Sequence, residues 1–364
     1  MNDPLGPFRD PGRLRGLTDR LHGLGSDRTL TFMHVCGTHE NAIGRFGVRS
    51  LLPPWLRVIA GPGCPVCVCP PAEIDAAVRL AANHGVILAT FGDMVRVPGR
   101  VSLAEAHARG ADVRVVRGVH EAATLAADHA ERQVVMVAVG FETTACTTAA
   151  AVLAGPPDNF SLIGAHRLIP PALYALLGLE DLRLDGFLLP GHATTVTGTA
   201  DYETFATASG VPAAVAGFEP LDILLALERL ATLAVHDQVA VANAYTRAVR
   251  PAGNPRARQA VDDVFDPEDA AWRGLGVIPA SGLTLRKPYR KFDALARFGM
   301  TLDPDLPESL PGCACGRVMV GLTEPEACPL FDATCTPTSP RGPCMVSQEG
   351  TCRSRFVYRE VRRG

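Results

Sequence analysis

Cysteines are the residues in this sequence whose number and spacing could do chemistry. The chain of 364 residues has eleven, of which four lie in residues 36–69, six in residues 313–352, and Cys146 between them. No apolar run reaches the roughly 18 to 20 residues of a membrane span, and the first residues have no apolar segment of the signal-peptide type. We therefore expect a cytoplasmic protein, whose thiols bind metal or take part in redox chemistry rather than form structural disulfides.

The first cysteine ends an apolar run, TFMHVCGTHE, in which Cys36 is followed by His39. A single cysteine at a strand end is usually a small buried hydrophobe. A thiolate there could also bind a soft metal ion. If a helix begins at Gly37, His39 would lie on the same face as Cys36 and could lower the pKa of its thiol or bind a proton.

A second group, GPGCPVCVCPP, places Cys64 and Cys67 on a Gly-Pro-Gly turn just before a predicted helix start. The helix dipole and free backbone N–H groups stabilise thiolates in this position, so we expect a lowered pKa and redox activity. Two cysteines three residues apart in a first turn can also close a disulfide. The alternative is a structural zinc site completed by Cys36 and His39. Cys69, two residues further on, has no assigned role.

Six cysteines fill a proline- and glycine-rich segment late in the chain: Cys313, Cys315, Cys328, Cys335, Cys344 and Cys352. Their density predicts a metal cluster held by four thiolates. An iron–sulfur cluster suits this irregular spacing better than zinc, whose sites generally pair two CxxC motifs. Four ligands leave two cysteines, which could form a disulfide that accepts electrons from the cluster.

The elements that must position these residues are short apolar runs separated by segments with helical periodicity. Eight runs are strand-like: TLTFMHV, LRVIAG, GVILATF, DVRVV, QVVMVAVG, FSLIGAH, DGFLLPG and PAAVAGF. Helix starts lie between several of them, at Pro70-Pro71-Ala-Glu73 and at a capping box formed by Ser102 and Glu105. The alternation of strands with helices predicts an α/β protein with parallel sheets. The runs form two groups of four, so we expect two similar α/β domains, at 1–125 and 126–281. Residues 282–364 are predicted to form a small irregular iron–sulfur domain, which core burial alone cannot stabilise.

Polar or sulfur-bearing residues follow nearly every predicted strand: Cys36, Cys64 with Cys67, Asp93, Glu142, His166, His192 and Glu219. Loops are generally polar, so any one of these has an ordinary explanation. Together they could converge on one crevice, because ligands bind beyond the carboxyl ends of parallel strands. Glu142 in GFETTAC and His192 in LPGHATTVTG are therefore candidates for proton handling or for support of a metal. The formal net charge of −3 gives no field that would gather nucleic acid.

Several short motifs occur together and in order: CGTHE, GPGCPVCV, GFETTA, PGHA and GPCMVSQEGTC. From about Phe32 to Cys352, the chain thereby resembles the HypD family of maturation factors for [NiFe] hydrogenases. The resemblance implies two α/β domains and a [4Fe-4S] domain. It also implies pairing with the small chaperone HypC, to form a scaffold on which an Fe(CN)2CO unit is assembled before transfer to the hydrogenase large subunit. The cyanides would come through HypE and, upstream, HypF.

The resemblance also assigns roles to residues. Cys36, with His39 beside it, would bind the transient iron, and a thiol of the chaperone would supply the other sulfur. Electrons would pass from the cluster, through a thiol pair beside it, to Cys64 and Cys67. The cluster ligands would be Cys313, Cys328, Cys335 and Cys352, and the adjacent pair Cys315 and Cys344.

The sequence departs from the family pattern at three positions: Cys69 stands where threonine is usual, Cys146 replaces a proline, and Leu189 replaces a common cysteine. Two other functions also fit the cysteines. A cluster-dependent disulfide reductase, similar to ferredoxin:thioredoxin reductase, would need the thiol pairs but not Cys36. A zinc-binding interaction module would have no redox role. We expect a redox-active maturation scaffold rather than a conventional turnover enzyme.

Overall fold

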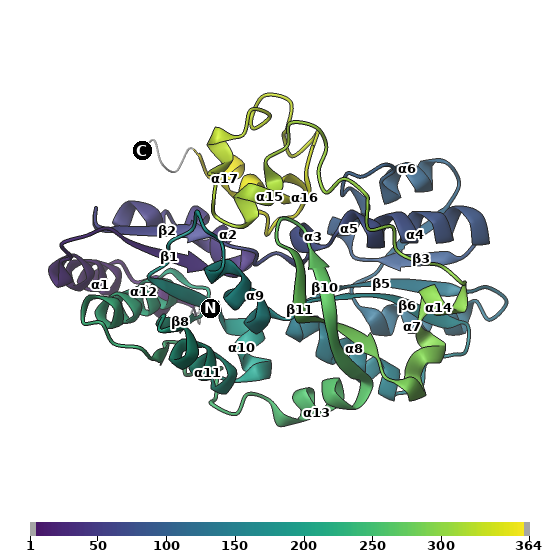
Figure 1. Ribbon diagram of the computed structural model, residues 1–364, viewed down its shortest axis with the longest axis horizontal. Coiled ribbons are helices and arrows are strands. Elements are labelled where there is room, and N and C mark those ends of the chain that lie inside the picture. Colours follow the sequence, from purple (N-terminus) through teal and green to yellow (C-terminus); the bar gives the residue numbers. More distant parts are fainter. Residues whose placement is uncertain (1–4, 360–364) are drawn as a thin grey trace.

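The computed structural model describes residues 5–359, and its main body holds two parallel β-sheets that lie side by side (Figure 1). Sheet A has the order β2-β1-β7-β8-β9, with the bounds β1 Leu30–His34, β2 Leu56–Ala60, β7 Gly186–Pro190, β8 Ala213–Ala216 and β9 Val241–Asn243. Sheet B has the order β4-β3-β5-β6, with the bounds β3 Ile87–Thr90, β4 Asp112–Val115, β5 Val134–Gly140 and β6 Phe160–His166.

All eight apolar runs form strands, and the predicted α/β class with parallel sheets is confirmed. Every residue of β3, β5 and β7 is buried. Parallel sheets are covered by helices on both faces, so their strands appear in the sequence as continuous apolar runs rather than alternating ones. Burial on both faces is therefore the reason why these strands were visible in the sequence.

Sheet A is covered by five helices: α1 (Pro11–Leu24), α2 (Gly37–Arg45), α9 (Ile169–Leu177), α11 (Ala200–Ser209) and α12 (Pro220–Val235). Leu188 of β7 lies in a core shared with α1, α2 and α12. Its neighbour Phe187 faces the opposite layer, where its ring contacts Phe205 of α11 with 5.5 Å between the ring centroids. The sheet thus separates two apolar layers.

Sheet B is covered by α4 (Pro71–His84) on one face and by α7 (Val119–Asp128) and α8 (Glu142–Leu153) on the other, with α13 (Pro255–Val264) packed against α8. Shorter helices connect the layers: η1 (Gly6–Phe8), η2 (Val48–Leu51), α3 (Pro65–Val68), α5 (Gly92–Val95), α6 (Leu103–Ala108) and α10 (Gly191–Thr197). The predicted helix start at Pro71 is confirmed, as is the capping box that Ser102 and Glu105 form at the start of α6.

The predicted grouping of the strands is wrong. Sheet A takes strands from both residues 30–60 and residues 186–243, and the whole of sheet B lies between them in the chain. A division at residue 125 would cut sheet B between β4 and β5. The physical reason is that β1 pairs with β7 as well as with β2, so the chain leaves sheet A through α3 and returns to it only after β6.

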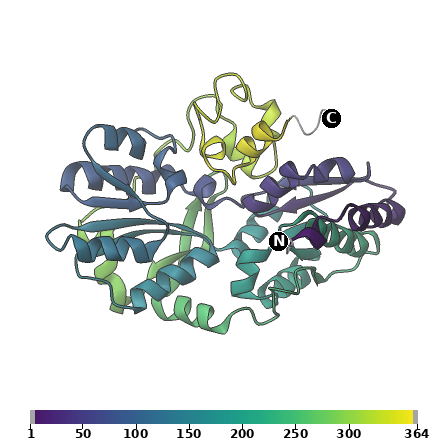
Figure 2. The same ribbon diagram turned by 180° about the vertical axis from the view of Figure 1, so that it is seen from behind.

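A hairpin that the sequence did not reveal lies between the two sheets (Figure 2). It consists of β10 (Phe265–Trp272) and β11 (Gly276–Leu285), which pair antiparallel. Trp272 and Arg273, where the hairpin turns, are both buried, and the Trp272 ring stacks on Phe141. The boundary that we expected at residue 282 falls inside β11, so the irregular part of the chain begins slightly later.

The C-terminal part is irregular and rich in cysteine, as expected. Its helices are short: η3 (Lys287–Phe292), α14 (Ala294–Arg297), α15 (Cys315–Met319), η4 (Pro325–Ala327), α16 (Pro343–Val346) and α17 (Thr351–Val357). The cysteine-bearing residues 313–359, here called the cysteine domain, lie above the junction of the two sheets (Figure 1). They contact the helices that follow β1 and β3, through Glu349 with Thr38 of α2 and Ser347 with Asp93 of α5.

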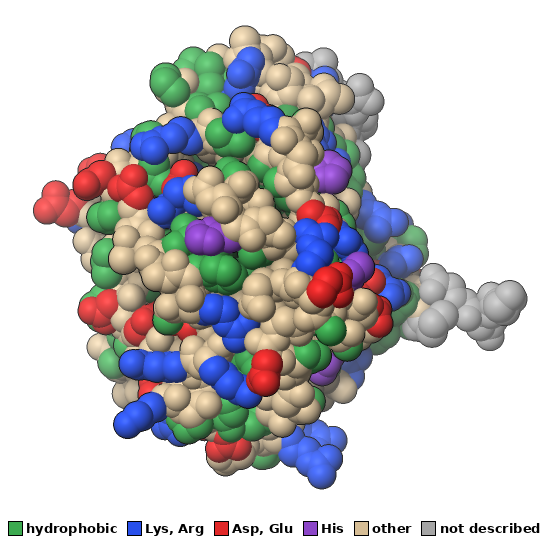
Figure 3. All heavy atoms as spheres, turned by 90° about the vertical axis from the view of Figure 1, so that its right-hand side faces the viewer, with side chains coloured by type: hydrophobic (Ala, Val, Ile, Leu, Met, Phe, Trp, Pro, Cys, Tyr) green, Lys and Arg blue, Asp and Glu red, His purple; other side chains and the backbone are tan. Residues whose placement is uncertain are grey.

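In residues 5–359, no helix is long and apolar enough to cross a membrane. The face drawn in Figure 3 carries basic and acidic side chains interspersed, without a continuous area of one sign. This distribution agrees with the small net charge of the chain.

Candidate functional site

Cys36 stands at the junction of the first two strands. It follows β1 and caps the N-terminus of α2 with extended backbone angles, φ −150° and ψ 123°. Gly63, in the loop after β2, lies directly against it: a Cβ atom on Gly63 would be 2.0 Å from the Cys36 nitrogen. The Gly37 N–H also donates to the Gly63 carbonyl at 2.8 Å. The segments that follow β1 and β2 therefore meet at Cys36.

The Cys36 thiol is protonated at neutral pH. Burial raises its pKa to about 12, and the nearby carboxylate of Glu349 acts in the same direction. The backbone N–H groups of His39 and Thr38 oppose this effect but do not outweigh it. Thr38 donates its hydroxyl to Glu349 at 2.6 Å, which brings the cysteine domain onto the first turn of α2. A metal ion that binds Cys36 must therefore displace a proton.

His39 is buried and neutral. Its Nε2–H donates to the Gly217 carbonyl at 2.9 Å, and burial lowers its pKa to about 3. The helix start at Gly37 is as expected, but the imidazole brings no positive charge to Cys36. Within His39, only the backbone N–H, and not the imidazole, stabilises the thiolate of Cys36.

Phe218, which the sequence did not single out, connects His39 with His192. Its ring centroid lies 5.0 Å from that of His39 and 4.0 Å from that of His192. His192 is partly exposed at the start of α10, and burial lowers its pKa. The residues after β1, β7 and β8 thus form one aromatic and imidazole cluster beside the Cys36 helix.

Cys64 and Cys67 form a close thiol pair on α3. Their Sγ atoms are 2.6 Å apart, and the Cys67 N–H approaches the Cys64 sulfur at 3.3 Å. A disulfide bond needs about 2.05 Å, so little movement would close it. The expected lowering of the pKa is wrong for Cys67, whose pKa is raised well above its ordinary value by burial. The helix has only four residues, and its dipole is too small to offset burial.

Arg273 fixes the backbone of this pair from the hairpin. Its guanidinium is buried and donates to the carbonyls of Cys67 and Cys69, at 3.1 and 2.8 Å. Its backbone N–H also donates to the Val68 carbonyl. No sequence motif pointed to this residue, which is separated from α3 by about two hundred positions. The Cys69 thiol is itself buried, which raises its pKa to about 12.

All six C-terminal cysteines line one hollow: Cys313, Cys315, Cys328, Cys335, Cys344 and Cys352. Cys344 lies within hydrogen-bonding reach of Cys67 on one side and of Cys315 and Cys352 on the other. Gly342 closes the hollow, since a Cβ there would be 2.8 Å from the Cys313 sulfur. A continuous line of thiols therefore runs from the hollow through Cys344 and Cys67 to Cys64.

The donors around the hollow suit an iron–sulfur cluster. They are thiols, which are the ligands that such clusters take. Among the described residues, no three His, Cys, Asp or Glu side chains are grouped as they would be around one metal ion. A cluster does not need such a group, because each of its thiolates binds a separate iron. The family resemblance and the clustered cysteines are both compatible with a cluster here.

Two of the predicted residues lie apart from Cys36. Glu142 begins α8, accepts a hydrogen bond from the Ile169 N–H at 2.7 Å, and has a pKa raised to about 7 by burial. His166 is buried against the Thr148 hydroxyl, 3.1 Å away. Asp93, in contrast, accepts bonds from Ser347 and Gln348 of the cysteine domain. The strand-end residues thus serve several places rather than one crevice.

Glu219, the last of them, caps α12 and pairs with Arg9. Cys146 donates to the Thr143 carbonyl within α8. Neither residue takes part in the arrangement around Cys36.

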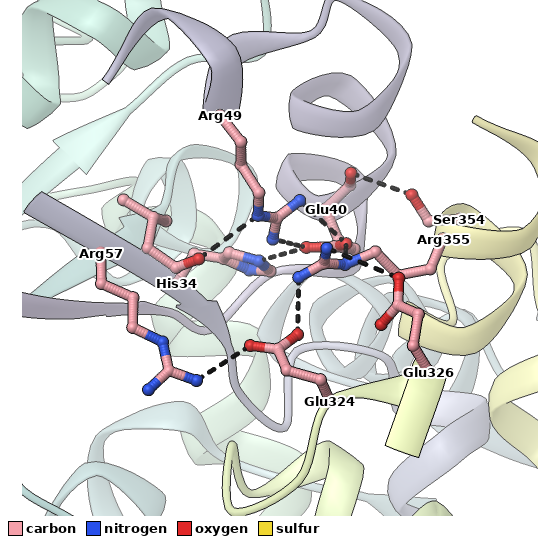
Figure 4. A network of polar contacts seen from close by, with 9 residues as sticks. His34, Glu40, Arg49, Arg57, Glu324, Glu326, Ser354 and Arg355 are labelled. Carbon is pink, nitrogen blue, oxygen red and sulfur yellow. Dashed lines mark hydrogen bonds and ion pairs between the residues drawn. The ribbon is translucent and has the colours of Figure 1, made fainter. Parts of the chain in front are cut away.

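Nothing in the sequence pointed to a buried polar network that lies beside Cys36 (Figure 4). Its centre is Glu40, whose carboxylate contacts His34, Arg49 and Arg355. Burial alone would raise the pKa of Glu40, but Arg49 and His34 hold it at about 2, so the group is ionised. An acidic residue in the first turn of a helix gave no sign of a partner three hundred positions away.

The fold and the site define an α/β protein in which cysteines from distant parts of the chain meet where two parallel sheets adjoin. Residues 13–359 match the family model described as HypD, hydrogenase formation hypA family. The chain belongs to the HypD family of hydrogenase maturation factors.

Individual relatives resemble the chain over nearly its full length. It is 43% identical to hydrogenase maturation factor HypD2 of Bradyrhizobium diazoefficiens, with 98% of this chain and 96% of the relative covered. It is 42% identical to a putative hydrogenase expression/formation protein of Methanocaldococcus jannaschii, with 97% and 99% covered. It is also 42% identical to hydrogenase maturation factor HypD of Escherichia coli, with 97% of each covered.

Proposed function

We propose that this protein holds the iron of a [NiFe] hydrogenase active site while its Fe(CN)2CO unit is assembled. It would act in the cytoplasm with a small chaperone of the HypC kind, receive cyanide through HypE with HypF upstream, and release the unit for the hydrogenase large subunit. The observation that carries the proposal is the line of thiols from the six-cysteine hollow to Cys64, beside the strand end that bears Cys36.

Cys36 is the proposed anchor for the iron cargo. A thiolate is a soft ligand, which suits the low-spin Fe(II) that carbonyl and cyanide favour. Its buried position keeps the thiol protonated until iron arrives, so binding releases a proton. In the proposal, His192 on the exposed side of the Phe218 ring takes part in that proton release, and His39 orients the first turn of α2 through Gly217. A thiol of the chaperone would complete the sulfur ligands.

In the proposal the resident cofactor is a [4Fe-4S] cluster held by Cys313, Cys328, Cys335 and Cys352. Such a cluster would supply single electrons, two of which, with two protons, would reduce a Cys315–Cys344 disulfide beside it to the thiol pair.

The pairs would then exchange by ordinary thiol chemistry. The Cys344 thiolate attacks the Cys67 sulfur of a Cys64–Cys67 disulfide, and Cys64 leaves as a thiolate. The Cys315 thiolate next attacks Cys344, which frees Cys67 and leaves a Cys315–Cys344 disulfide. Two electrons reach the Cys64 and Cys67 pair, and two protons are taken up by its thiols.

Infrared spectroscopy tests the central claim. The protein is purified without oxygen together with its small partner, as the parent chain and as Cys36→Ala. We expect carbonyl and cyanide stretching bands in the parent complex and none in Cys36→Ala. An intact parent complex without these bands would overturn the proposal.

A second candidate is a disulfide reductase similar to ferredoxin:thioredoxin reductase. The contact between Cys344 and Cys67 favours it, because a reductase needs an electron path between two thiol pairs. Cys36 separates the two functions, since a reductase does not need it. If Cys36→Ala still reduced disulfides but failed to mature hydrogenase, the scaffold would be favoured, and a variant that kept both activities would favour the reductase.

A further inference from the structure

The carboxylate of Glu40 joins three separate parts of the chain. His34 at the end of β1 donates to it at 2.7 Å, and Arg49 of η2 at 2.6 Å. Arg355 of α17, in the cysteine domain, pairs with its other oxygen at 3.4 Å. The Glu40 side chain is 1% exposed and that of Arg355 is 8% exposed. Figure 4 shows the side chains of Glu40 and Arg355 pointing toward one another, from α2 and α17.

Further contacts attach the same two helices and their flanking residues. Ser354 donates its hydroxyl to the Glu40 carbonyl at 3.1 Å, and Asn41 donates to the Gln348 carbonyl at 3.2 Å. A Cβ on Gly37 would be 2.4 Å from that of Glu349. Residues 348–355 therefore cover the start of α2, and with it Cys36.

Among residues 5–359, the network has as many arginines as glutamates. Its arginines are Arg49, Arg57 and Arg355, and its glutamates are Glu40, Glu324 and Glu326. Arg355 also bonds Glu324 at 2.7 Å, and Glu324 pairs in turn with Arg57 of β2. If α17 moved away, Glu40 would lose one of its two arginines, and Arg355 would lose the carboxylate of Glu40 on α2. An incompletely paired buried charge is unfavourable, so Glu40 and α17 keep each other in place.

The covering segment depends on its cysteines. It follows Cys344 and includes Cys352, two of the six thiols that line the hollow. Small irregular domains of this kind hold their shape through metal binding rather than core burial.

We propose that Glu40 is a positioning residue that couples the state of the cysteine domain to Cys36. When metal holds the domain, Arg355 reaches Glu40, the first turn of α2 is fixed and Cys36 is covered. When the domain is empty, Arg355 withdraws and Cys36 becomes accessible. The first turn of α2, and with it the Cys36 side chain, is thereby fixed only on a protein whose own cluster is in place. This inference rests on the function proposed above.

The labelling rate of Cys36 tests the coupling. The full-length chain is produced without other maturation proteins, so that Cys36 carries no cargo, and is treated with iodoacetamide at one pH. Mass spectrometry of peptides then follows Cys36 alone. The arms are the protein as purified, the same protein after iron chelation, Glu40→Gln, Arg355→Met, and the double variant. Arg359→Met is the matched control, because Arg359 pairs with Asp332 inside the cysteine domain.

We expect chelation to speed labelling about tenfold and the two single variants to do so with the cluster still present. The double variant should label no faster than the single ones, since each acts through the other. Arg359→Met should label as the parent does. Equal rates before and after chelation would overturn the inference, and so would slow labelling in a cluster-containing Glu40→Gln. Absence of iron–sulfur absorption from the parent would instead overturn the proposed cofactor.

Discussion

The sulfur atoms of Cys64 and Cys67 lie 2.6 Å apart, and the thiol of Cys344 is within reach of the second of them. Cys67 is therefore both a partner of Cys64 and the thiol that connects this pair to Cys344. Because Cys64 has its partner in the same turn, the pair closes without movement of either sheet.

Cys64→Ser should abolish the disulfide that mild oxidation forms in α3. Peptide mapping of the oxidised protein, with free thiols blocked, measures this directly. Cys69→Ser is the control, because Cys69 points to the Pro70 carbonyl and not to the pair. A Cys67–Cys69 disulfide in the parent protein would contradict the assignment.

Alkylation of Cys36 should quicken about tenfold for each pH unit, without levelling off below pH ~10. The reason is that only the thiolate reacts, and burial raises the pKa of this thiol to about 12. Free cysteine in the same buffers provides the comparison, since its rate levels off above its pKa of about 8.5. A plateau for Cys36 near neutral pH would mean that a positive charge stabilises the thiolate.

Gly63→Ala should destabilise the protein by about 1–3 kcal/mol or more, because the new methyl group would collide with the Cys36 backbone. Urea unfolding under anaerobic conditions gives the difference from the parent. Gly118→Ala is the control for the glycine-to-alanine change itself, because Gly118 has an extended backbone and a Cβ there meets nothing within 4 Å. Equal losses from the two substitutions would show that the contact at Cys36 is not the cause.

Glu142 should make the protein less stable as pH rises from about 4.5 to 7. Its pKa is raised from 4.5 to about 7 by burial, so the unfolded chain loses this proton at lower pH than the folded one. The stabilisation is complete below pH 4.5 and is lost through this window, by about 3 kcal/mol in all.

The corresponding comparison is the free energy of unfolding of Glu142→Gln at pH 5 and pH 8. This variant should lose less stability over that interval than the parent. Glu121→Gln, on the exposed side of α7, should follow the parent. An unchanged pH dependence in Glu142→Gln would contradict the assigned pKa.

The sequence was most informative where structure is local. The helix starts at Gly37 and Pro71 and the Ser102 capping box each depend on residues within one turn. The strands were visible because burial on both faces leaves an apolar run. Which strands pair was not visible, because β1 and β2 leave no local mark of their neighbour β7.

For the site, too, the local features were predicted and the long-range contacts were not. The cysteines were identified from spacing alone, and the structure brings nine of them into or beside one line of thiols. Three charged residues that hold the segments around these cysteines come from two to three hundred positions away: Glu349 on Thr38, Arg273 on the Cys67 carbonyl and Arg355 on Glu40. Single charged residues in irregular segments carry no pattern. The pKa shifts also differed from expectation, since burial depends on the whole fold and outweighed the local dipole at Cys67.

The strands of sheet B lie in the sequence between β2 and β7 of sheet A, and this order has a consequence for synthesis on the ribosome. β1 and β2 emerge first, but β7 follows Ala60 only after about 125 further residues. At ~5–20 residues per second, that interval is roughly 6–25 s. Throughout it, one edge of β1 has no partner, and an unpaired strand edge is open to pairing with other chains. A nascent chain of this protein must therefore be shielded until β7 pairs with β1. The yield of folded protein then depends on how quickly residues 61–185, which include the strands of sheet B, are synthesised.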